Sequence, residues 1–250
     1  MRRFLIAFVC LPTLAVAQDN PPAAADGISF TLGFGALSRP AYFGADETVV
    51  DPTGSFSLQQ LEFGPISLGD GEGLGLRFKP SIGIVAERRA EDYDELDGLA
   101  DIDFSFEVGG GISFATPDYE VFAKVRQGLS GHEALVAEVG GDVFYKPTEE
   151  LTLSLGPRVF WGSDDYAQTY FGVTAADSLA SSFDAFDASA GIVSAGVAAE
   201  ARYQFNETWG VTGKISYDQL RDDAADSPIT VSDDQIKASV VLTRRITLGF

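Results

Sequence analysis

The sequence predicts an all-β protein: a closed antiparallel transmembrane β-barrel of about twelve strands, with ten as the alternative count. Three observations predict this fold. Apolar and polar residues alternate with a period of two through most of the chain, as they do in a strand with one apolar face. Short polar turns alternate with longer acidic segments between these strands. The chain also opens on an export-like segment and ends on an aromatic residue, Phe250.

The expected strands are defined by this alternation. In residues 102–107, isoleucine and phenylalanine alternate with aspartate, serine and glutamate. The same pattern places strands at residues 28–37, 53–61, 64–69, 73–79, 81–89, 102–115, 118–129, 134–146, 150–162, 188–205, 209–221 and 235–250. The segments 64–69 and 73–79 are short and weakly marked, so ten strands remain the alternative.

The connections between these strands are of two kinds. Short polar turns fall at residues 116–118, 147–150 and 206–208. Longer acidic segments fall at residues 38–52, 90–101, 163–187 and 222–234. Outer-membrane barrels have tight periplasmic turns and longer external loops. We therefore expect the short turns at the periplasmic end and the acidic segments outside the cell.

A membrane explains the alternation, because lipid cannot hydrogen-bond a backbone and only a closed sheet leaves no free edge. A soluble all-β protein alternates too, but the many long alternating segments favour the barrel. The inner face can carry charges, and those expected to face the lumen are Glu107, Lys124, Arg126, Glu138, Asp142, Arg158, Lys214 and Lys237. Arg244 falls among the lipid-facing positions, which requires it to snorkel or a bulge to shift the register.

The first 17 residues are expected to be a cleaved signal peptide. Arg2 and Arg3 precede an apolar run that is too short to span a bilayer as a helix, and small residues follow it. Cleavage is expected before Gln18. Residues 18–27 would then be a short lead-in, and residues 28–250 a single barrel domain in the outer membrane of a Gram-negative bacterium.

Composition excludes several classes of function. The single cysteine, Cys10, lies in the expected signal peptide, so the remaining chain has no thiolate nucleophile, thiolate metal site or disulfide. Without Arg2 and Arg3, 15 Lys and Arg stand against 37 Asp and Glu, a formal charge of −22. This charge argues against nucleic acid as a partner. No cofactor is expected.

Five stretches together resemble the MipA/OmpV family of outer-membrane proteins, the MltA-interacting proteins. They run in the family's order as RPAYFGAD (39–46), LDGLADID (96–103), GHEALVAEVG (131–140), LTLSLGPRVFWGSDDYAQTYFGVT (151–174) and DDAADSPI (222–229). The chain departs from the family pattern at Ala134, where glycine is expected. Its last strand also ends RRITLGF rather than with the usual tyrosine–phenylalanine pair. Neither departure changes the barrel assignment.

The resemblance implies an outer-membrane barrel without catalytic residues. The namesake of the family is linked to peptidoglycan remodelling, as a scaffold that joins a lytic transglycosylase to a murein synthase. Other members are described as porin-like, adhesive, or involved in osmotic or antibiotic response. We therefore expect a non-enzymatic scaffold or envelope-maintenance protein, with murein lytic transglycosylase and synthase as candidate partners. Outer-membrane lipid, lipopolysaccharide and the barrel-assembly machinery, which reads a terminal aromatic such as Phe250, are further expected partners.

The stretch WGSDDYAQTYFG, residues 161–172, combines two adjacent carboxylates with four aromatic side chains. It could form a catalytic, metal-binding or sugar-binding centre, or the rim of a barrel. Because Trp161 continues the outward face of a strand and an acidic segment follows, we interpret the stretch as a rim. The candidate rim and loop residues are Trp161, Asp164, Asp165, Tyr166, Tyr170 and Phe171, and the last three are expected to pack the loop over the mouth.

Three other features carry weaker hypotheses. The sole histidine, His132, lies near Ser130, but a nucleophile–base pair also needs a third orienting group. The glycine-rich GDGEGLG at 69–75 precedes a strand and not a helix, which indicates a hairpin rather than a phosphate site. Carboxylates at 222–226 and 233–234 could hold divalent cations, but calcium needs about six to eight oxygen ligands. A solvated loop is the simpler interpretation.

Mixed charges on the inner faces allow two arrangements. Opposite charges could pair across the lumen and close it, or they could line a narrow aqueous path. A barrel of about twelve strands has a lumen between those of filled eight-stranded and open sixteen-stranded barrels. We expect pairing, and a narrow porin-like channel for small solutes is the alternative function.

Overall fold

Long antiparallel strands make up most of the computed structural model, which describes residues 27–63, 66–68 and 74–249. The strands are β1 (Gly27–Pro40), β2 (Thr48–Phe63), β3 (Ile66–Leu68), β4 (Gly75–Val85), β5 (Ser105–Ala115), β6 (Tyr119–Gly128), β7 (Leu135–Tyr145), β8 (Leu151–Gly162), β9 (Gly191–Gln204), β10 (Trp209–Leu220) and β11 (Asp234–Gly249). The expected signal peptide with its cleavage site before Gln18, nearly all of the 18–27 lead-in, most of the 69–75 hairpin and Phe250 lie outside the described residues.

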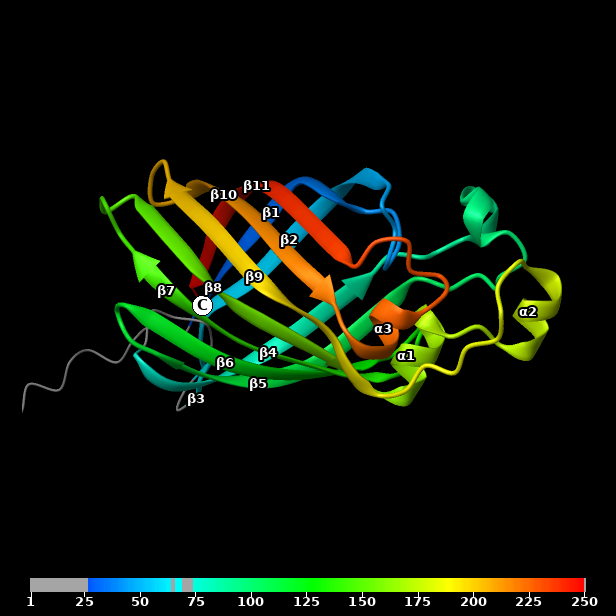
Figure 1. The fold of residues 1–250 in the computed structure, drawn as a ribbon. Coiled ribbons are helices and arrows are strands. Elements are labelled where there is room, and N and C mark those ends of the chain that lie inside the picture. The colour runs from blue at the N-terminus through cyan, green and yellow to red at the C-terminus, as the bar shows by residue number, and fades with distance from the viewer. Residues whose placement is uncertain (1–26, 64–65, 69–73, 250) are drawn as a thin grey trace, which may run out of the picture.

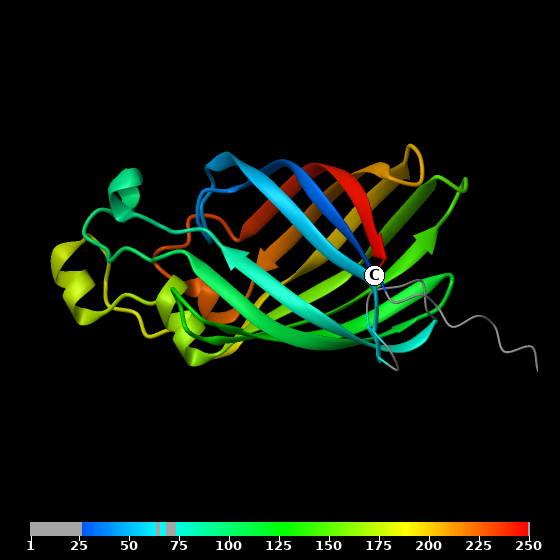
Figure 2. The same cartoon turned by 180° about the vertical axis from the view of Figure 1, so that it is seen from behind.

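The strands of the described residues form one sheet in the order β3-β2-β1-β11-β10-β9-β8-β7-β6-β5-β4. Neighbours along the chain pair antiparallel, and the first long strand, β1, also pairs antiparallel with the last, β11. The sheet curls round on itself into the barrel seen from two sides in Figures 1 and 2. The predicted all-β antiparallel barrel is confirmed.

Within the described residues, ten strands are long, which matches the alternative of ten rather than twelve. β3 has only 3 residues, whereas the others have 10 to 16. The expected strands 73–79 and 81–89 form a single strand, β4, which continues through Pro80 and ends at Val85. Proline cannot donate a ladder hydrogen bond and is confined largely to sheet edges. Because β4 is the last strand in the sheet order, it accommodates Pro80 without a break.

The two ends of the sheet lie at β2, with the short β3, and at β4, and no ladder joins these ends within the described residues. Within the described residues, β4 pairs with β5 alone. Over the same part of the chain, β2 pairs with β1 along nearly its whole length and with β3 only at its last residues. Both seam strands carry an internal proline, Pro52 in β2 and Pro80 in β4. We call this place the β2–β4 seam.

Outward and inward positions alternate along the strands. The outward Phe34 and Phe78 are 73% and 75% exposed, as suits an apolar surface that faces lipid. Glu107 of β5 points inward and is 2% exposed. The outward Arg244 keeps an unbroken register with β1, so no bulge displaces it. Its guanidinium lies 5.3 Å from the ring centroid of Trp209, which covers part of its charge.

Short helices gather at one end of the barrel, within the segments expected to be acidic loops (Figure 1). They are η1 (Ala90–Asp92), η2 (Asp94–Leu96), α1 (Asp164–Phe171), α2 (Ala175–Ala180) and α3 (Asp222–Asp226). Two clusters of buried apolar side chains lie here, one around Tyr166 and Phe171 and the other around Leu96 and Ile229. The hydrophobic core therefore lies at this helix-bearing end. Among the described residues, no helix has the length and apolar character needed to cross a membrane.

Candidate functional site

The helix α1 follows β8 directly and packs into the helix-bearing end. Its first turn contains Asp164 and Asp165, where carboxylates interact favourably with the helix dipole. Oδ1 of Asp164 also accepts a hydrogen bond from the backbone N–H of Ala190 at 2.8 Å. The buried side chains of α1 are Tyr166, Ala167, Tyr170 and Phe171. Their spacing gives the helix one apolar face, which it turns into the protein.

The two tyrosines of α1 belong to an aromatic cluster built from several segments. The ring centroids of Tyr166 and Tyr170 are 4.7 Å apart. The ring of Phe43 lies 5.0 Å from Tyr170, and that of Phe160 lies 5.4 Å from Tyr166. The ring of His132 completes the cluster at 5.1 Å from Tyr166. Contacts at these distances are favourable for aromatic rings, and they hold α1 against strand β8 and the loop that follows β1.

Trp161 and Asp165 lie outside this cluster. Trp161 is close to the end of β8, where it pairs with Ala137 of β7 and Ile192 of β9. The register with β9 shifts just before it. Asp165 is exposed and lines a cavity beside α1. The stretch 161–172 thus combines a strand end with a helix, and its two carboxylates have separate surroundings.

His132 is buried under α1 and uses both ring nitrogens. Its Nδ1 accepts a hydrogen bond from the backbone N–H of Ala134 at 3.0 Å, which places the ring proton on Nε2. Nε2 then donates to Oε1 of Glu107 at 3.1 Å. The backbone N–H of His132 donates to Oγ of Ser105 at 3.1 Å, and this oxygen is 3.2 Å from the hydroxyl of Tyr170. His132 therefore ties its own turn to β5 and to α1.

Ser130 does not pair with His132. Its hydroxyl donates to the carbonyl oxygen of Phe104 at 3.1 Å and accepts from the backbone N–H of Phe106 at 3.2 Å. A serine nucleophile needs its base within hydrogen-bond reach. Because the nitrogens of His132 bond elsewhere, the two side chains hold the turn against β5 rather than forming the pair considered from the sequence.

Ion pairs on the inner faces of β5 to β8 connect six of the eight charges predicted to face the lumen. Glu107 pairs with Arg126 at 2.6 Å, and Arg126 is 3.6 Å from Glu138. Glu138 also lies 3.9 Å from both Lys124 and Arg158. The charges thus form a connected network along one wall of the barrel.

Arg158 anchors the far end of this network. Its Nη2 donates to both carboxylate oxygens of Asp142, at 2.8 and 2.9 Å. Its guanidinium lies 5.0 Å from the ring centroid of Phe122, and Nζ of Lys124 lies 4.2 Å from the same centroid. An aromatic ring at these distances attracts a cation through its negative face, so Phe122 stabilises both charges.

The other charged side chains of the inner faces lie outside this network. Glu120 of β6, which the sequence analysis did not single out, accepts hydrogen bonds from Lys79 at 2.8 Å and from Arg77 at 3.2 Å. Lys214 and Lys237 lie on β10 and β11 and form no ion pair with another described residue. Nζ of Lys237 instead lies 5.7 Å from the ring centroid of Phe43.

The carboxylates proposed as cation ligands engage in local hydrogen bonds. Oδ2 of Asp223 accepts from the backbone N–H of Ser189 at 2.8 Å. Oδ1 of Asp234 accepts from the hydroxyl of Tyr217 at 2.6 Å. In the part of the chain that the structure describes, no group of three or more His, Cys, Asp or Glu side chains could hold a metal ion.

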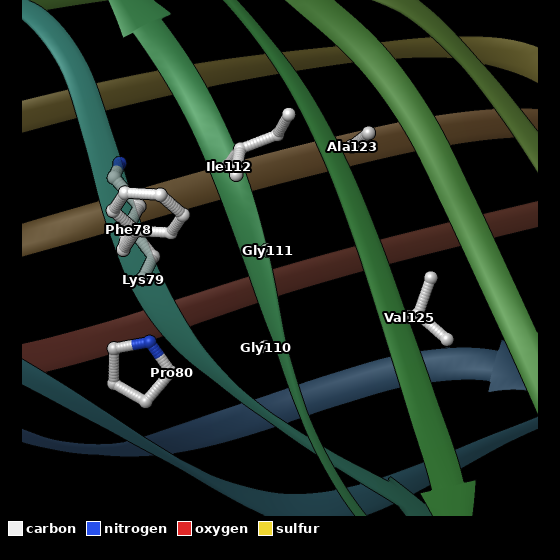
Figure 3. A pocket seen from close by; sticks show the side chains of 8 residues that line it. All are labelled: Phe78, Lys79, Pro80, Gly110, Gly111, Ile112, Ala123 and Val125. Carbon is white, nitrogen blue, oxygen red and sulfur yellow. The ribbon is translucent and has the colours of Figure 1, made fainter.

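A cavity and a groove hollow the surface of the described residues. A cavity of about 550 Å³ lies beside α1 at the helix-bearing end, and most of its ionisable side chains are acidic. A second hollow of about 600 Å³ is a shallow groove on the outer face of β4, β5 and β6 (Figure 3). Gly110 and Ala123 leave space there beside the exposed side chains of Phe78 and Ile112. This groove belongs to the lipid-facing surface, whereas the cavity is polar.

Several residues of the helix-bearing end were missed in the sequence analysis. Phe43 and Tyr42 lie in a segment expected to be a long acidic loop, yet Phe43 packs edge-to-face against Tyr170 of α1 and Tyr42 is buried. The hydroxyl of Tyr42 donates to Glu95 at 3.2 Å, and burial raises the pKa of this tyrosine. Arg88 was assigned to a strand and is instead buried beside the cavity. The one feature of the sequence that could have predicted this burial is the pair of adjacent aromatic residues, Tyr42 and Phe43, within an acidic segment.

Residues 32–246 match the protein family described as MltA-interacting protein MipA. The chain belongs to this family. The resemblance inferred from the five sequence stretches is therefore confirmed. Together with the apolar outer face of the barrel, membership makes the chain a MipA-family outer-membrane β-barrel. None of the curated proteins matches the chain.

Two solved structures are similar to this MipA-family barrel. One is the COG4313 outer membrane channel from Pseudomonas putida F1, with a TM-score of 0.46 and 11% identity over 90% of this chain and 97% of that one. The other is the NanC porin, with a TM-score of 0.37 and 12% identity over 87% of this chain and 98% of that one. Similarity this distant carries no conclusion about what the MipA-family chain binds or conducts.

Proposed function

We propose that this MipA-family barrel is a non-enzymatic scaffold that holds peptidoglycan-remodelling enzymes at its periplasmic end. The pairing of its inner charges and the packing of its helix-bearing end carry the proposal. The ion-pair network lines the inner faces of β5 to β8, and α1 packs with Phe43 and Phe160 at the helix-bearing end. Inner charges that pair with one another and an end packed with aromatic side chains favour a surface for partners over a path for solutes. The family description, an MltA-interacting protein, supports a murein lytic transglycosylase, and with it a synthase, as the partner class.

The short turns opposite the helix-bearing end are the docking edge of this proposal. Their amides are capped by side chains: Oγ1 of Thr116 accepts from the N–H of Tyr119 at 3.0 Å, and Oδ1 of Asn206 accepts from the N–H of Trp209 at 2.9 Å. Turns fixed in this way lose little entropy when a partner binds. In the same orientation, the acidic helix-bearing end faces lipopolysaccharide and the medium.

Site-specific photo-crosslinking in cell envelopes tests the scaffold. A photo-reactive residue placed at Asp118 or at Glu207 samples the short turns, and one placed at Leu179, which is 91% exposed on α2, is the control at the opposite end. We expect murein enzymes to be captured from the turn positions and not from Leu179. Equal capture from both ends, or no murein enzyme from either turn, contradicts the proposal.

The alternative, a narrow channel for small solutes, is tested on the same protein. The refolded chain is inserted into planar bilayers, and the current through single molecules is recorded. The scaffold proposal predicts no stepwise current, because the inner charges pair with one another. Regular single-channel steps, enlarged when Arg158→Ala opens the network, favour the channel instead.

A further inference from the structure

The acidic cavity beside α1 contains one buried cation. Arg88 is 8% exposed and lines the cavity together with Asp101, Asp165 and Asp177. Its backbone is fixed by two hydrogen bonds with Ile102, at 2.9 and 2.8 Å, which form an isolated bridge between the segments after β4 and before β5. The backbone of Arg88 therefore has a defined place in the cavity wall.

The guanidinium of Arg88 is poorly compensated within the protein. Nη1 donates to the carbonyl oxygen of Tyr170 at 3.3 Å, and Nε is buried without a hydrogen-bond partner. Among the described residues, no carboxylate forms an ion pair with it, and burial lowers the pKa of this arginine. A buried charge without a partner is costly, whereas most buried polar groups in proteins are paired. An anionic group entering the cavity would supply the missing partner.

Two carboxylates of the cavity wall, those of Asp101 and Asp177, do not supply that partner because they accept hydrogen bonds from other parts of the protein. Oδ1 of Asp101 accepts from the backbone N–H of Ala90 at 2.8 Å. Oδ2 of Asp177 accepts from the hydroxyl of Thr174 at 2.7 Å and caps α2. Both attract Arg88 from a distance without reaching it. They are thus fixed parts of the wall.

The other side chains that line the cavity determine which anionic ligands it can bind. Glu133 and Asp165 also line the cavity, and neither side chain takes part in a hydrogen bond or ion pair with another described residue. Metal binding does not explain them, because no described group of three ligands could hold an ion. A simple anion would be repelled by these carboxylates, whereas a ligand that also carries a cation would be attracted at both of its ends.

We propose that the cavity binds a small zwitterion of the amino-acid or short-peptide class, with its carboxylate on Arg88 and its ammonium group facing Asp165 and Glu133. This site lies at the helix-bearing end, opposite the short turns, and it does not depend on the scaffold role. Failure of one proposal therefore leaves the other standing.

Calorimetric titration of the purified full chain with glycylglycine tests the site, with acetate and methylammonium as probes of each half. We expect saturable binding of glycylglycine that is stronger than binding of either half. Arg88→Gln is expected to weaken glycylglycine binding at least about tenfold, which is the size of one charge-assisted hydrogen bond. Arg89→Gln is the matched control, because Arg89 is exposed and pairs with Glu87 at 3.0 Å, and it should bind as the wild type does.

A second pair of variants tests the ammonium end in a chain that keeps Arg88. Asp165→Asn should weaken glycylglycine several-fold and strengthen acetate, because it removes one of the carboxylates that repel a simple anion, whereas Asp226→Asn, on the exposed end of α3, should change neither. No saturable binding by the wild type, equal loss in Arg88→Gln and Arg89→Gln, or acetate binding as tightly as glycylglycine overturns the proposal. Arg88→Lys, which keeps a cation, should retain part of the affinity if the charge is what matters.

Discussion

Most polar side chains buried at the helix-bearing end have partners for both of their hydrogen-bonding functions. His132 uses both ring nitrogens. Oγ of Ser227 donates to the carbonyl oxygen of Phe171 at 2.6 Å and accepts from the N–H of Ile229 at 3.2 Å. Oε1 of Gln235 accepts from the N–H of Gly44 at 3.2 Å. Because burying an unpaired polar group is costly, these residues fix the loops to the barrel in one arrangement.

Replacing His132 with alanine should destabilise the protein by about 1–3 kcal/mol, because the N–H of Ala134 and one oxygen of Glu107 would lose their partner inside the protein. The measurement is the free energy of unfolding in urea, with the exposed Lys146→Ala as the control. An unchanged midpoint for His132→Ala would show that the turn is held without its histidine.

Alkaline pH should loosen the contact of α1 with the barrel. Burial raises the pKa of Tyr170 from 10.0 to about 12, so the folded protein holds this proton more tightly than the unfolded chain does. The stability that this residue contributes is fully present below about pH 10 and is lost as the pH rises through about 12.

The check is the unfolding midpoint measured across this pH range for the wild type and for Tyr170→Phe, which cannot titrate. The variant should lose less stability than the wild type as the pH rises. Part of the decline should remain, because burial also raises the pKa of the neighbouring Tyr166. Parallel curves for the two proteins would contradict this assignment.

At the scale of elements, a helix follows one of the strands, and a proline interrupts one of the ladders between strands. The segment DDYAQTYF of α1 has acidic residues first and buried side chains at helical spacing, and both features favour a helix. In β8, Pro157 coincides with a gap in the ladder to β7, between the pairs Gly140–Arg158 and Val143–Leu155. Proline has no N–H to donate, so the ladder is interrupted there while the strand continues.

Truncating Tyr166 should release α1 from the mouth of the barrel. Its side chain is 1% exposed, and removal of a large buried aromatic ring costs about 3–5 kcal/mol. We expect Tyr166→Ala to lower the unfolding midpoint and to make the 163–187 segment sensitive to protease. Leu179→Ala on the neighbouring α2 is the matched control, because that side chain is exposed and should leave both properties unchanged. Equal protease sensitivity of the two variants would show that Tyr166 does not anchor α1.

At the scale of the whole molecule, the stabilising interactions are distributed unevenly around the circumference of the barrel and along its axis. The ion-pair network strengthens the wall formed by β5 to β8, and the apolar clusters secure the helix-bearing end. The β2–β4 seam lacks a ladder within the described residues. Unpaired strand edges open more readily than strands paired on both sides. The seam is thus the weakest place in the wall.

Backbone amide hydrogen exchange should reveal this difference. In the protein held in detergent micelles, we expect the amides of β4 to exchange faster than those of β10, which has a ladder on each side. Mass spectrometry of peptides from the two strands gives the rates. Equal protection of β4 and β10 would mean that the seam is closed in solution.

The sequence by itself determined the barrel, because an alternation such as that of residues 102–107 is tied to the two faces of a strand wherever the strand lies. It also indicated most of the inward charges, such as Glu107 and Arg126, since the face that a residue occupies follows from its position in the strand. The strand count was less certain. Pro80 suggests a break, and only its place at a sheet edge allows β4 to continue.

Only the tertiary structure decided which charges meet and which stay alone. The partners of His132 come from β5 and from its own turn, and the cavity around Arg88 gathers residues from segments as far apart as 88 and 177. Loops have no periodic sequence pattern that predicts contacts between distant residues, because the path of a loop depends on its packing against the rest of the chain. The fold could therefore be inferred from local alternation, whereas the helix-bearing end with its buried arginine is a product of long-range contacts.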